Sequence, residues 1–298
     1  MIVTTTRALM AIALFAVGAS AQDGLKVYIS ADLEGVVGVV TADQLGPSGF
    51  EYGRFRQIMT NEVNAAIEAA REAGATEILV SDSHGNGENL LIEQLPVDIQ
   101  LIRSWPRPLM MMEGIDESFD AVIFIGYHSS TTNTSGVRAH TISSANLTSI
   151  RLNGVEMLEA SINAAIAGDF GVPVVMISGD DAVIEEAGRV IGDIEGAVVK
   201  WSLGFHSART LMPEASYALI KEKVGAALAR LDDFEPYTMD GPIELQITFK
   251  NYMPAELMAY LPIVDRVDAH TIRFVGQDMT EISKFLEFTT SYQINITP

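Results

Sequence analysis

The sequence predicts an α/β fold, with a mostly parallel sheet that carries helices on both faces, plus a smaller α+β C-terminal domain. Four apolar runs rich in Val and Ile alternate with segments of helical periodicity, which is typical of parallel sheets covered by helices. The 298 residues, 48% of them apolar, are enough to bury a substantial core. After Trp201 the character of the chain changes. We therefore predict three parts: residues 1–22, an α/β domain over residues 23–205, and an α+β domain over residues 206–298.

Residues 1–22 have the pattern of a secretory signal peptide. One Arg precedes an apolar stretch from Ala8 to Val17, and the tripeptide "ASA" ending at Ala21 matches the small-x-small pattern that signal peptidase reads. A membrane anchor is the alternative, but this stretch is roughly half the ~20 residues that a bilayer span needs. We expect cleavage near Ala21 and an exported protein, periplasmic or secreted. No later stretch is long and apolar enough to span a membrane, so no membrane contact is expected after signal removal.

The charge balance excludes whole classes of partner. The formal net charge is −20, and such a surface repels nucleic acid and anionic lipid. The chain has no cysteine, so an exported form carries no disulfide, and a thiolate metal site is excluded. A metal bound by this protein must therefore use carboxylates and imidazoles.

The elements of the α/β part follow from apolar runs, helical stripes and the turn residues between them. We predict strands at Lys26–Asp32, at Glu77–Asp82, at "AVIFIGYH" ending in His128 and at "VPVVMISGDD" ending in Asp180 and Asp181, with helices at Phe55–Ala73, Pro108–Phe119 and Val155–Ala167 between them. In the C-terminal part we predict helices at Pro213–Leu231, at "PAELMAYL" and at Asp278–Thr290, with strands at "PIELQITF" and "AHTIRFVG".

Acids and histidines stand where the predicted strands end. Asp32 and Glu34 follow the first strand, His84 lies two residues beyond the second, and His128 ends the third. Ligands of such sheets bind outside the carboxyl ends of the strands, and neighbouring strand ends lie ~5 Å apart, so these side chains can converge. Carboxylates with a few histidines suit Zn²⁺, Mn²⁺ or Co²⁺, and carboxylate bridges hold two ions together. One metal cleft explains these residues together.

Each of these residues alone has a plainer interpretation. Asp32 or Glu34 could be a helix cap or a solvated loop acid, His84 a turn residue and His128 a hydrogen-bonded core histidine.

Other motifs in the sequence give no support for a different function. No phosphate loop surrounds the glycines at 85 and 87, no G-x-S-x-G elbow surrounds the serines after His128, and the methionines at 110–112 are expected to fill core gaps. We expect His206 and His270 to be structural.

Several stretches of the sequence resemble a known family. These are "ADLEGVVG", "GRFRQIMTNEVNAAI", "VSDSHGNGENLL", "FIGYHSS" followed by "GVRAHT", "EASINAAIAGDFGVPVVMISGDD", "NYMPAELMAYLP" and "GQDM". In this order and spacing they are similar to the zinc-dependent D-aminopeptidases of the DppA type, and the resemblance covers about residues 26 to 290.

The resemblance implies a set of site residues. It implies that the metal ligands are Asp32, Glu34, His84, His128 and Glu159. Helical periodicity cannot choose between Glu159 and Glu156, because residues three apart share a helix face, whereas the fit to the family favours Glu159. It also implies two divalent metal ions, with Zn²⁺ favoured.

His140, in "GVRAHT", matches a histidine that the family places near the metals and for which a nucleophilic role is proposed. Two metal ions favour an activated water as the attacker, so we expect His140 to act as general acid/base or to stabilise the oxyanion. Direct attack by the imidazole is the alternative, and it requires a covalent acyl intermediate.

The resemblance implies an aminopeptidase that hydrolyses short peptides with an N-terminal D-amino acid, D-Ala favoured. It also implies a ring-shaped homo-oligomer. Two alternatives stay open: a metal-dependent amidase or peptidase of the same fold that acts on L-peptides or other cell-wall fragments, and a non-enzymatic exported protein that binds metal or peptide.

Overall fold

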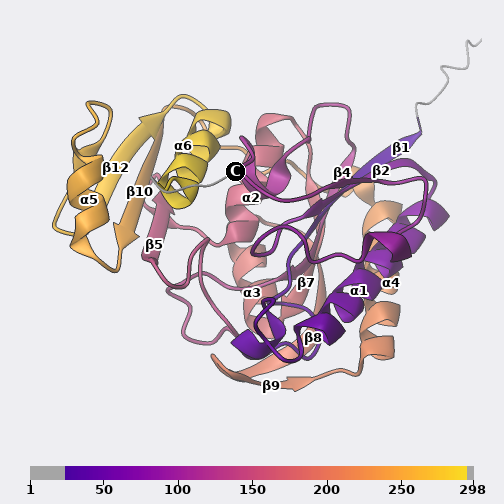
Figure 1. Cartoon of the computed structure of the whole chain (residues 1–298). Helices are drawn as coiled ribbons and strands as arrows, with labels where there is room; N and C mark the ends of the chain where they lie inside the picture. The colour runs from indigo at the N-terminus through magenta and orange to yellow at the C-terminus, as the bar shows by residue number, and fades with distance from the viewer. Residues whose placement is uncertain (1–23, 294–298) are drawn as a thin grey trace, which may run out of the picture.

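The large sheet has seven strands in the order β3-β2-β1-β4-β7-β8-β9, as seen in a computed structural model that describes residues 24–293 (Figure 1). All pairs are parallel except β8 with β9. The strands are β1 (Leu25–Ala31), β2 (Ala75–Asp82), β3 (Gln100–Ile102), β4 (Ala121–Tyr127), β7 (Val174–Asp180), β8 (Glu195–Gly204) and β9 (Ser207–Thr210). The predicted mostly parallel α/β fold is confirmed. The predicted signal peptide lies outside the described residues.

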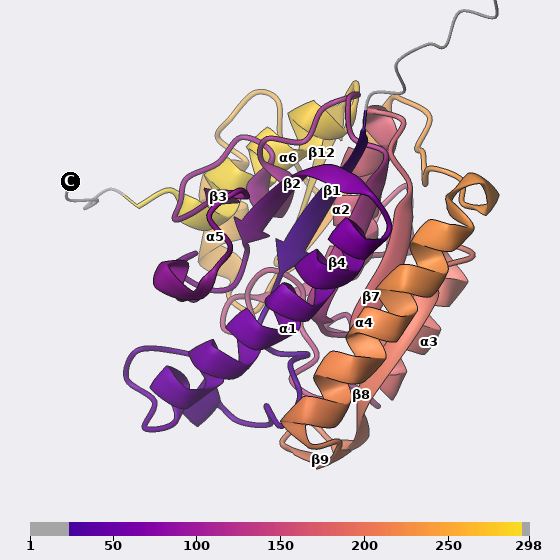
Figure 2. The same cartoon turned by 90° about the vertical axis from the view of Figure 1, so that its right-hand side faces the viewer.

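Helices cover both faces of this sheet because its strands are apolar on both faces. In β1, Val27, Ile29 and Ala31 pack on one face, while Tyr28 packs on the other. The first face is covered by α1 (Tyr52–Glu72) and α4 (Pro213–Ala229), which lie side by side in Figure 2. The opposite face is covered by α2 (Glu159–Asp169) and α3 (Asp181–Val190). Among the described residues, no helix combines the length and apolarity that a bilayer crossing requires.

A second, antiparallel sheet of five strands stands beside the helices α2 and α3, with strand order β11-β12-β10-β5-β6 (Figure 1). Its strands are β5 (Leu147–Leu152), β6 (Val155–Glu156), β10 (Ile243–Phe249), β11 (Asp265–Arg266) and β12 (Thr271–Gly276), and its helices are α5 (Tyr252–Met258) and α6 (Met279–Ser291). Alternate residues of β10 are buried, as expected for a strand with one covered face.

Elements on each side of residue 205 pack with elements from the other side. The helix α4 lies after that position but packs on the large sheet, and β5 lies before it but pairs with β10 of the small sheet. The two sheets therefore share one chain in an interleaved order, and their joint core runs through α2.

Two predicted helices are corrected by the structure. The helix expected at Pro108–Phe119 is wrong: only a short 3-10 turn, Met110–Met112, is present. Met110 and Gly114 have φ of 51° and 83°, which an α-helix does not accommodate. Its three methionines are buried in the core, as predicted.

The helix expected at Val155–Ala167 begins only at Glu159. Asn153 and Gly154 have φ of 48° and 80° and form a tight hairpin turn between β5 and β6, so Val155 and Glu156 belong to a strand.

Candidate metal centre

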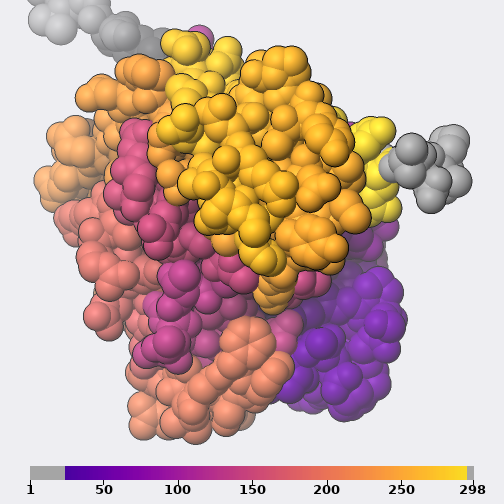
Figure 3. Space-filling view, turned by 90° about the vertical axis from the view of Figure 1, so that its left-hand side faces the viewer, coloured from indigo at the N-terminus to yellow at the C-terminus, as the bar shows by residue number. Residues whose placement is uncertain are grey.

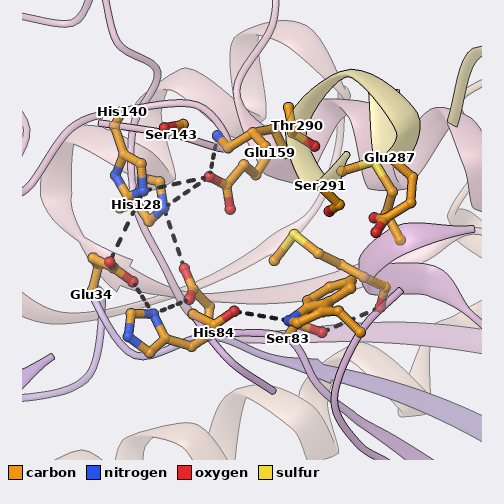
Figure 4. A pocket seen from close by; sticks show the side chains of 16 residues that line it. Glu34, Ser83, His84, His128, His140, Ser143, Glu159, Glu287, Thr290 and Ser291 are labelled. Atoms are coloured by element: carbon orange, nitrogen blue, oxygen red, sulfur yellow. Dashed lines mark hydrogen bonds and ion pairs between the residues drawn. The ribbon is translucent and has the colours of Figure 1, made fainter. Parts of the chain in front are cut away.

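One cavity of about 290 Å³ lies at the carboxyl ends of β1, β2 and β4 (Figure 4). All six predicted site residues line it: Asp32, Glu34, His84, His128, His140 and Glu159. Five of them are 7% exposed or less, so their polar atoms face one another rather than bulk water. The residues come from four separate stretches of sequence, which the parallel topology brings to one edge.

The turn after β1 holds Asp32 and Glu34 against the end of β4. The Asp32 N–H donates to the carbonyl of Ile125, and the Gly35 N–H donates to that of Gly126. A side chain at Gly35 would place its Cβ 2.0 Å from the Tyr127 oxygen, and one at Gly126 would lie 2.2 Å from the Asp32 oxygen. Both glycines are therefore required for this close approach of two backbones.

Lys200 fixes the position of the loop that contains Glu34. It is fully buried in β8, and its ammonium donates to the main-chain carbonyls of Glu34, Val36 and Val39. Burial lowers the pKa of Lys200 to about 8. A buried ammonium with three carbonyl acceptors fixes the path of a loop that has no regular hydrogen bonding of its own.

Glu62 of α1 fixes the same loop from another side. Its Oε1 accepts from the Val37 N–H at 3.1 Å and from the Ser216 hydroxyl at 2.7 Å, while its Oε2 is buried without a hydrogen-bond partner. Burial raises the pKa of Glu62 to about 7. Helices α1 and α4 are thereby joined to the loop after β1.

His84 is placed by the acid at the end of β2. The Asp82 carboxylate accepts from the N–H groups of Asn89 and Leu90 and from the Asn89 side-chain amide. That amide in turn donates to the carbonyl of His84. Asp82 therefore shapes the loop, and the imidazole beyond it reaches the cavity.

The loop with His128 and His140 is held by two further acids. Asp180, at the end of β7, accepts from the Val137 N–H at 2.6 Å and also caps α3. Glu186 of α3 accepts from the N–H and hydroxyl of Ser130. The two imidazole rings stack in parallel, 4.0 Å between centroids and 7° between planes.

Glu159 is the first residue of α2, and its Oε1 accepts from the Ile142 N–H at 2.7 Å. Glu156 instead accepts from the Ser149 hydroxyl and pairs with Arg151, and it does not line the cavity. The structure thus brings Glu159 to the site and leaves Glu156 in the small sheet.

The nitrogen and oxygen atoms converge closely across the cavity. His84 Nδ1 lies 3.1 Å from an Asp32 oxygen and 2.8 Å from a Glu34 oxygen. His128 Nε2 lies 3.3 Å from the other Asp32 oxygen and 3.4 Å from Glu159. His140 Nε2 is 4.0 Å from Glu34 and 3.8 Å from Glu159. Two sets have ligand atoms close enough to hold an ion: Asp32 with Glu34 and His128, and His128 with His140 and Glu159.

Each of the three imidazoles has its second ring nitrogen on a main-chain carbonyl. His84 Nε2 is 2.7 Å from the Leu45 oxygen, His128 Nδ1 is 3.1 Å from the Ser129 oxygen, and His140 Nδ1 is 2.8 Å from the Arg138 oxygen. A carbonyl only accepts, so these nitrogens carry a proton, and with a metal bound the other nitrogen of each ring would offer its lone pair on the side of the carboxylates. Metal-binding histidines have this arrangement.

The electrostatics of the cluster call for positive charge. Burial lowers the pKa of His84, but the carboxylates of Glu34 and Asp32 outweigh burial and raise that pKa well above its ordinary value. Burial raises the pKa of the Asp32 carboxyl, and neighbouring Glu34 raises it further. Burial alone would also raise the pKa of Glu34, but His84 outweighs it and holds that pKa well below the ordinary value. Protons or cations must therefore compensate the acids.

The donor set fits a bound metal. Asp32 Oδ2, Glu34 Oε2 and His128 Nε2 are buried and have no hydrogen-bond partner. Unpaired buried polar atoms are costly, and a shared cation would satisfy them, because Asp32, Glu34 and His128 have ligand atoms within 4.8 Å of one another. Carboxylates and imidazoles without thiolate are the ligands of Zn²⁺, Mn²⁺ or Co²⁺.

The far wall of the cavity was not predicted from the sequence. It includes Trp105, Met111 and three residues of the last turns of α6: Glu287, Thr290 and Ser291. The one available signal is that Glu287 follows Met279 and Ser283 at spacings of four, on a helix face that is otherwise buried. His206 and His270 lie outside the cavity, as predicted.

Fold and site together define the class of the protein. A parallel α/β sheet presents buried carboxylates and imidazoles at its carboxyl edge, in a cavity large enough for a small substrate. This is the arrangement of a metal-dependent enzyme.

Comparisons with known proteins identify the family. A peptidase family model described as D-aminopeptidase matches residues 25–288. A D-aminopeptidase of Bacillus subtilis (strain 168) is 34% identical over 261 residues, which cover 86% of this chain and 93% of that protein. The solved structure of the Zn-dependent D-aminopeptidase DppA from Bacillus subtilis, described as a self-compartmentalizing protease, matches with a TM-score of 0.84 and 32% identity, over 90% of this chain and 100% of that one. The chain belongs to the D-aminopeptidase family of metallopeptidases.

Proposed function

We propose that this protein is an exported aminopeptidase that hydrolyses short peptides with an N-terminal D-amino acid, D-Ala favoured. Its cofactor is a pair of divalent ions, Zn²⁺ favoured, held by Asp32, Glu34, His84, His128 and Glu159. The observation that carries the proposal is the convergence of these five side chains in one cavity, where Asp32 Oδ2, Glu34 Oε2 and His128 Nε2 are buried without a hydrogen-bond partner. Family membership and the Zn-dependent relative support the same activity.

The metal ions and the protein have different roles in the proposed reaction. A pair of divalent ions held at this cluster would supply an acidified water as the attacker and would polarise the peptide carbonyl. The side chains fix the position of that pair, and the cavity walls exclude bulk water from the reacting atoms. Asp32 is the best placed bridge, because its two oxygens face different imidazoles, those of His84 and His128.

His140 acts as the general acid/base. The Arg138 carbonyl holds the proton on Nδ1, so Nε2 is free to accept a proton within the cavity and return it to the leaving amine. Its ring is anchored by the stack on His128, and it is 12% exposed at the side chain, the most accessible imidazole of the three. It therefore lies on the cavity side of the cluster, where a substrate enters.

Export and substrate are linked in this proposal. An exported enzyme meets D-Ala in cell-wall peptides, and the predicted signal peptide would take it there. The acidic chain, with a net charge of −20, does not favour nucleic acid or anionic membranes as partners.

We also propose a homo-oligomer, ring-shaped as the resemblance implies. The DppA structure is that of a self-compartmentalizing protease. In this chain large apolar side chains are exposed on the small-sheet end: Tyr252, Leu257, Tyr260, Ile263 and Phe288. Figure 3 shows that C-terminal residues, orange to yellow, form the upper part of that face. Light scattering of the mature protein tests this, and a monomer at micromolar concentration contradicts it.

The activity is tested with a panel of peptides on the purified mature protein. D-Ala-D-Ala, D-Ala oligomers and L-Ala peptides are compared before chelation, after chelation and after return of Zn²⁺. We expect release of N-terminal D-Ala, loss on chelation and recovery with Zn²⁺. Preference for L-peptides would instead favour an amidase or peptidase of the same fold, and absence of any turnover would favour a binding protein.

A further inference from the structure

The helix α6 closes the substrate cavity from the side opposite the metal-binding cluster. In Figure 4 the histidines and Glu34 lie on one side, and Glu287, Thr290 and Ser291 lie on the other. These three residues are spaced i, i+3 and i+4, so they share one helix face. The C-terminal end of the described chain therefore contributes polar groups to a site whose predicted ligands all lie before residue 160.

Glu287 is a buried carboxylate that forms no ion pair among the described residues. It is 8% exposed, and its Oε1 has no hydrogen bond. None of the ion pairs among residues 24–293 includes it. Arg107 interacts with it through space, but the guanidinium of Arg107 donates to the Ser81 hydroxyl and to the Asp82 carbonyl.

The metals cannot supply the missing charge. Two divalent ions would be balanced by the three carboxylates of Asp32, Glu34 and Glu159 together with the deprotonated attacking water, which leaves no positive charge for Glu287. Among the described residues Glu287, on the opposite wall, then forms no ion pair, and Arg107 acts on it only through space. A buried carboxylate without a hydrogen bond or ion pair is unfavourable, and a cation from the substrate would stabilise it.

We propose that Glu287 binds the free α-ammonium group of the substrate and thereby determines that this enzyme acts as an aminopeptidase. The inference rests on the proposed function, because it names how that site selects its substrate. Backbone geometry puts the ammonium nitrogen ~2.5 Å from the scissile carbonyl carbon, and an ammonium–carboxylate hydrogen bond spans about 2.8 Å. The scissile carbonyl and the ammonium belong to the same substrate residue, and the cluster and Glu287 line the same cavity of about 290 Å³.

A role of Glu287 in binding the α-ammonium group would explain why substrates without that group are rejected. A peptide with a blocked amino terminus, or an internal peptide bond, would bury Glu287 beside a neutral group. Sites that bind a charged group reject analogues without it, because the buried partner is left unpaired.

The test uses two hydroxamates that chelate zinc and differ in one group. D-Alanine hydroxamic acid carries the ammonium, and D-lactic hydroxamic acid carries a hydroxyl in its place. Calorimetry measures both affinities for the zinc-loaded mature protein, for Glu287→Gln, which keeps the shape of the side chain, and for Glu222→Gln. Glu222 is exposed on α4 and makes the chemically identical control change.

We expect the wild type and Glu222→Gln to prefer the ammonium compound by about 10- to 150-fold. Glu287→Gln should lose this preference, keep its affinity for the hydroxyl compound and retain the zinc content of the wild type. A wild type without the preference, a Glu287→Gln variant that keeps it, or loss of zinc in that variant would each overturn the assignment. The first of these outcomes needs no variant, so a folding defect cannot hide the result.

Failure of the proposed function gives a different result. A wild type that shows the Glu287-dependent preference but releases no D-alanine from D-Ala-D-Ala contradicts the aminopeptidase activity and leaves the ammonium site intact. A wild type that releases D-alanine while Glu287→Gln retains the preference contradicts the ammonium site alone.

Discussion

Asp32 after β1, Asp82 at the end of β2 and Asp180 at the end of β7 have similar positions in the sequence but different roles in the structure. Asp32 keeps Oδ2 free of hydrogen bonds and directs both oxygens at imidazoles. Asp82 is saturated by the backbone of Asn89 and Leu90, and Asp180 by that of Val137 and Val183. All three are buried.

Position alone does not give the role of an acid at the end of a strand. The position at the carboxyl edge of a parallel sheet brings a carboxylate near the site, but its partners decide its role. An acid with N–H donors around it is already compensated and shapes a loop, whereas an acid facing lone pairs requires a cation. Variants of these acids and of the residues around them test this division.

Removal of Asp32 should have the largest effect. We expect Asp32→Ala to lose bound metal and to lower kcat/KM by on the order of 10³-fold or more, because it contacts two imidazoles of the cluster and metal chemistry supplies several kcal/mol of transition-state stabilisation. Elemental analysis and the D-Ala-D-Ala assay measure both quantities. Full metal content in this variant would contradict its place as a ligand.

His140→Ala should separate activity from metal binding. Without the general acid/base, kcat should fall by about 10²- to 10⁴-fold while the metal content stays that of the wild type. His206→Ala is the control, because His206 lies on the exposed surface outside the cavity. Loss of metal on removal of His140 would make it a ligand, which its distance of 3.8 Å from Glu159 also permits.

Glu62→Gln should remove a pH dependence of stability. Burial raises the pKa of Glu62 from 4.5 to about 7, so between these pH values the folded chain binds more protons there than the unfolded chain. The free energy of unfolding therefore falls as pH rises through this window, by on the order of 3 kcal/mol at about 1.4 kcal/mol per unit. Urea denaturation at about pH 5 and pH 8 should show that the variant gains stability over wild type as pH rises. An unchanged difference between the two proteins would contradict the buried carboxyl.

Asp180→Ala should cost stability but no metal. Loss of the α3 cap and of the acceptor for the Val137 N–H should lower the free energy of unfolding by about 2 kcal/mol. Glu185→Ala, on the exposed side of the same helix, should stay within about 0.5 kcal/mol of wild type. If Asp180→Ala also loses metal at full stability, the division between the two kinds of acid fails.

The sequence was most informative about site residues that the parallel topology of the sheet brings together. Asp32, His84 and His128 could be placed together because short loops after neighbouring parallel strands must meet at one edge. The choice of Glu159 needed the family resemblance, and the structure agrees because the turn at Asn153 starts a strand that takes Glu156 away from the cavity.

Other features depend on contacts that no local pattern encodes. Lys200 interrupts the apolar run of β8, and only tertiary packing shows that its ammonium is buried on three carbonyls. Glu287 comes from the far end of the chain, and the apolar methionines at 110–112 suggested a helix although they form a buried turn. Long-range packing overrides periodicity at these positions.

The central claim is that five side chains hold two divalent ions in one cavity. A crystal structure of the zinc-loaded protein, with anomalous diffraction recorded at the zinc edge, tests it most directly. We predict two anomalous peaks about 3.5 to 4 Å apart, enclosed by Asp32, Glu34, His84, His128 and Glu159. Absence of zinc from this cavity in fully active crystals, or zinc bound only elsewhere, would contradict the account.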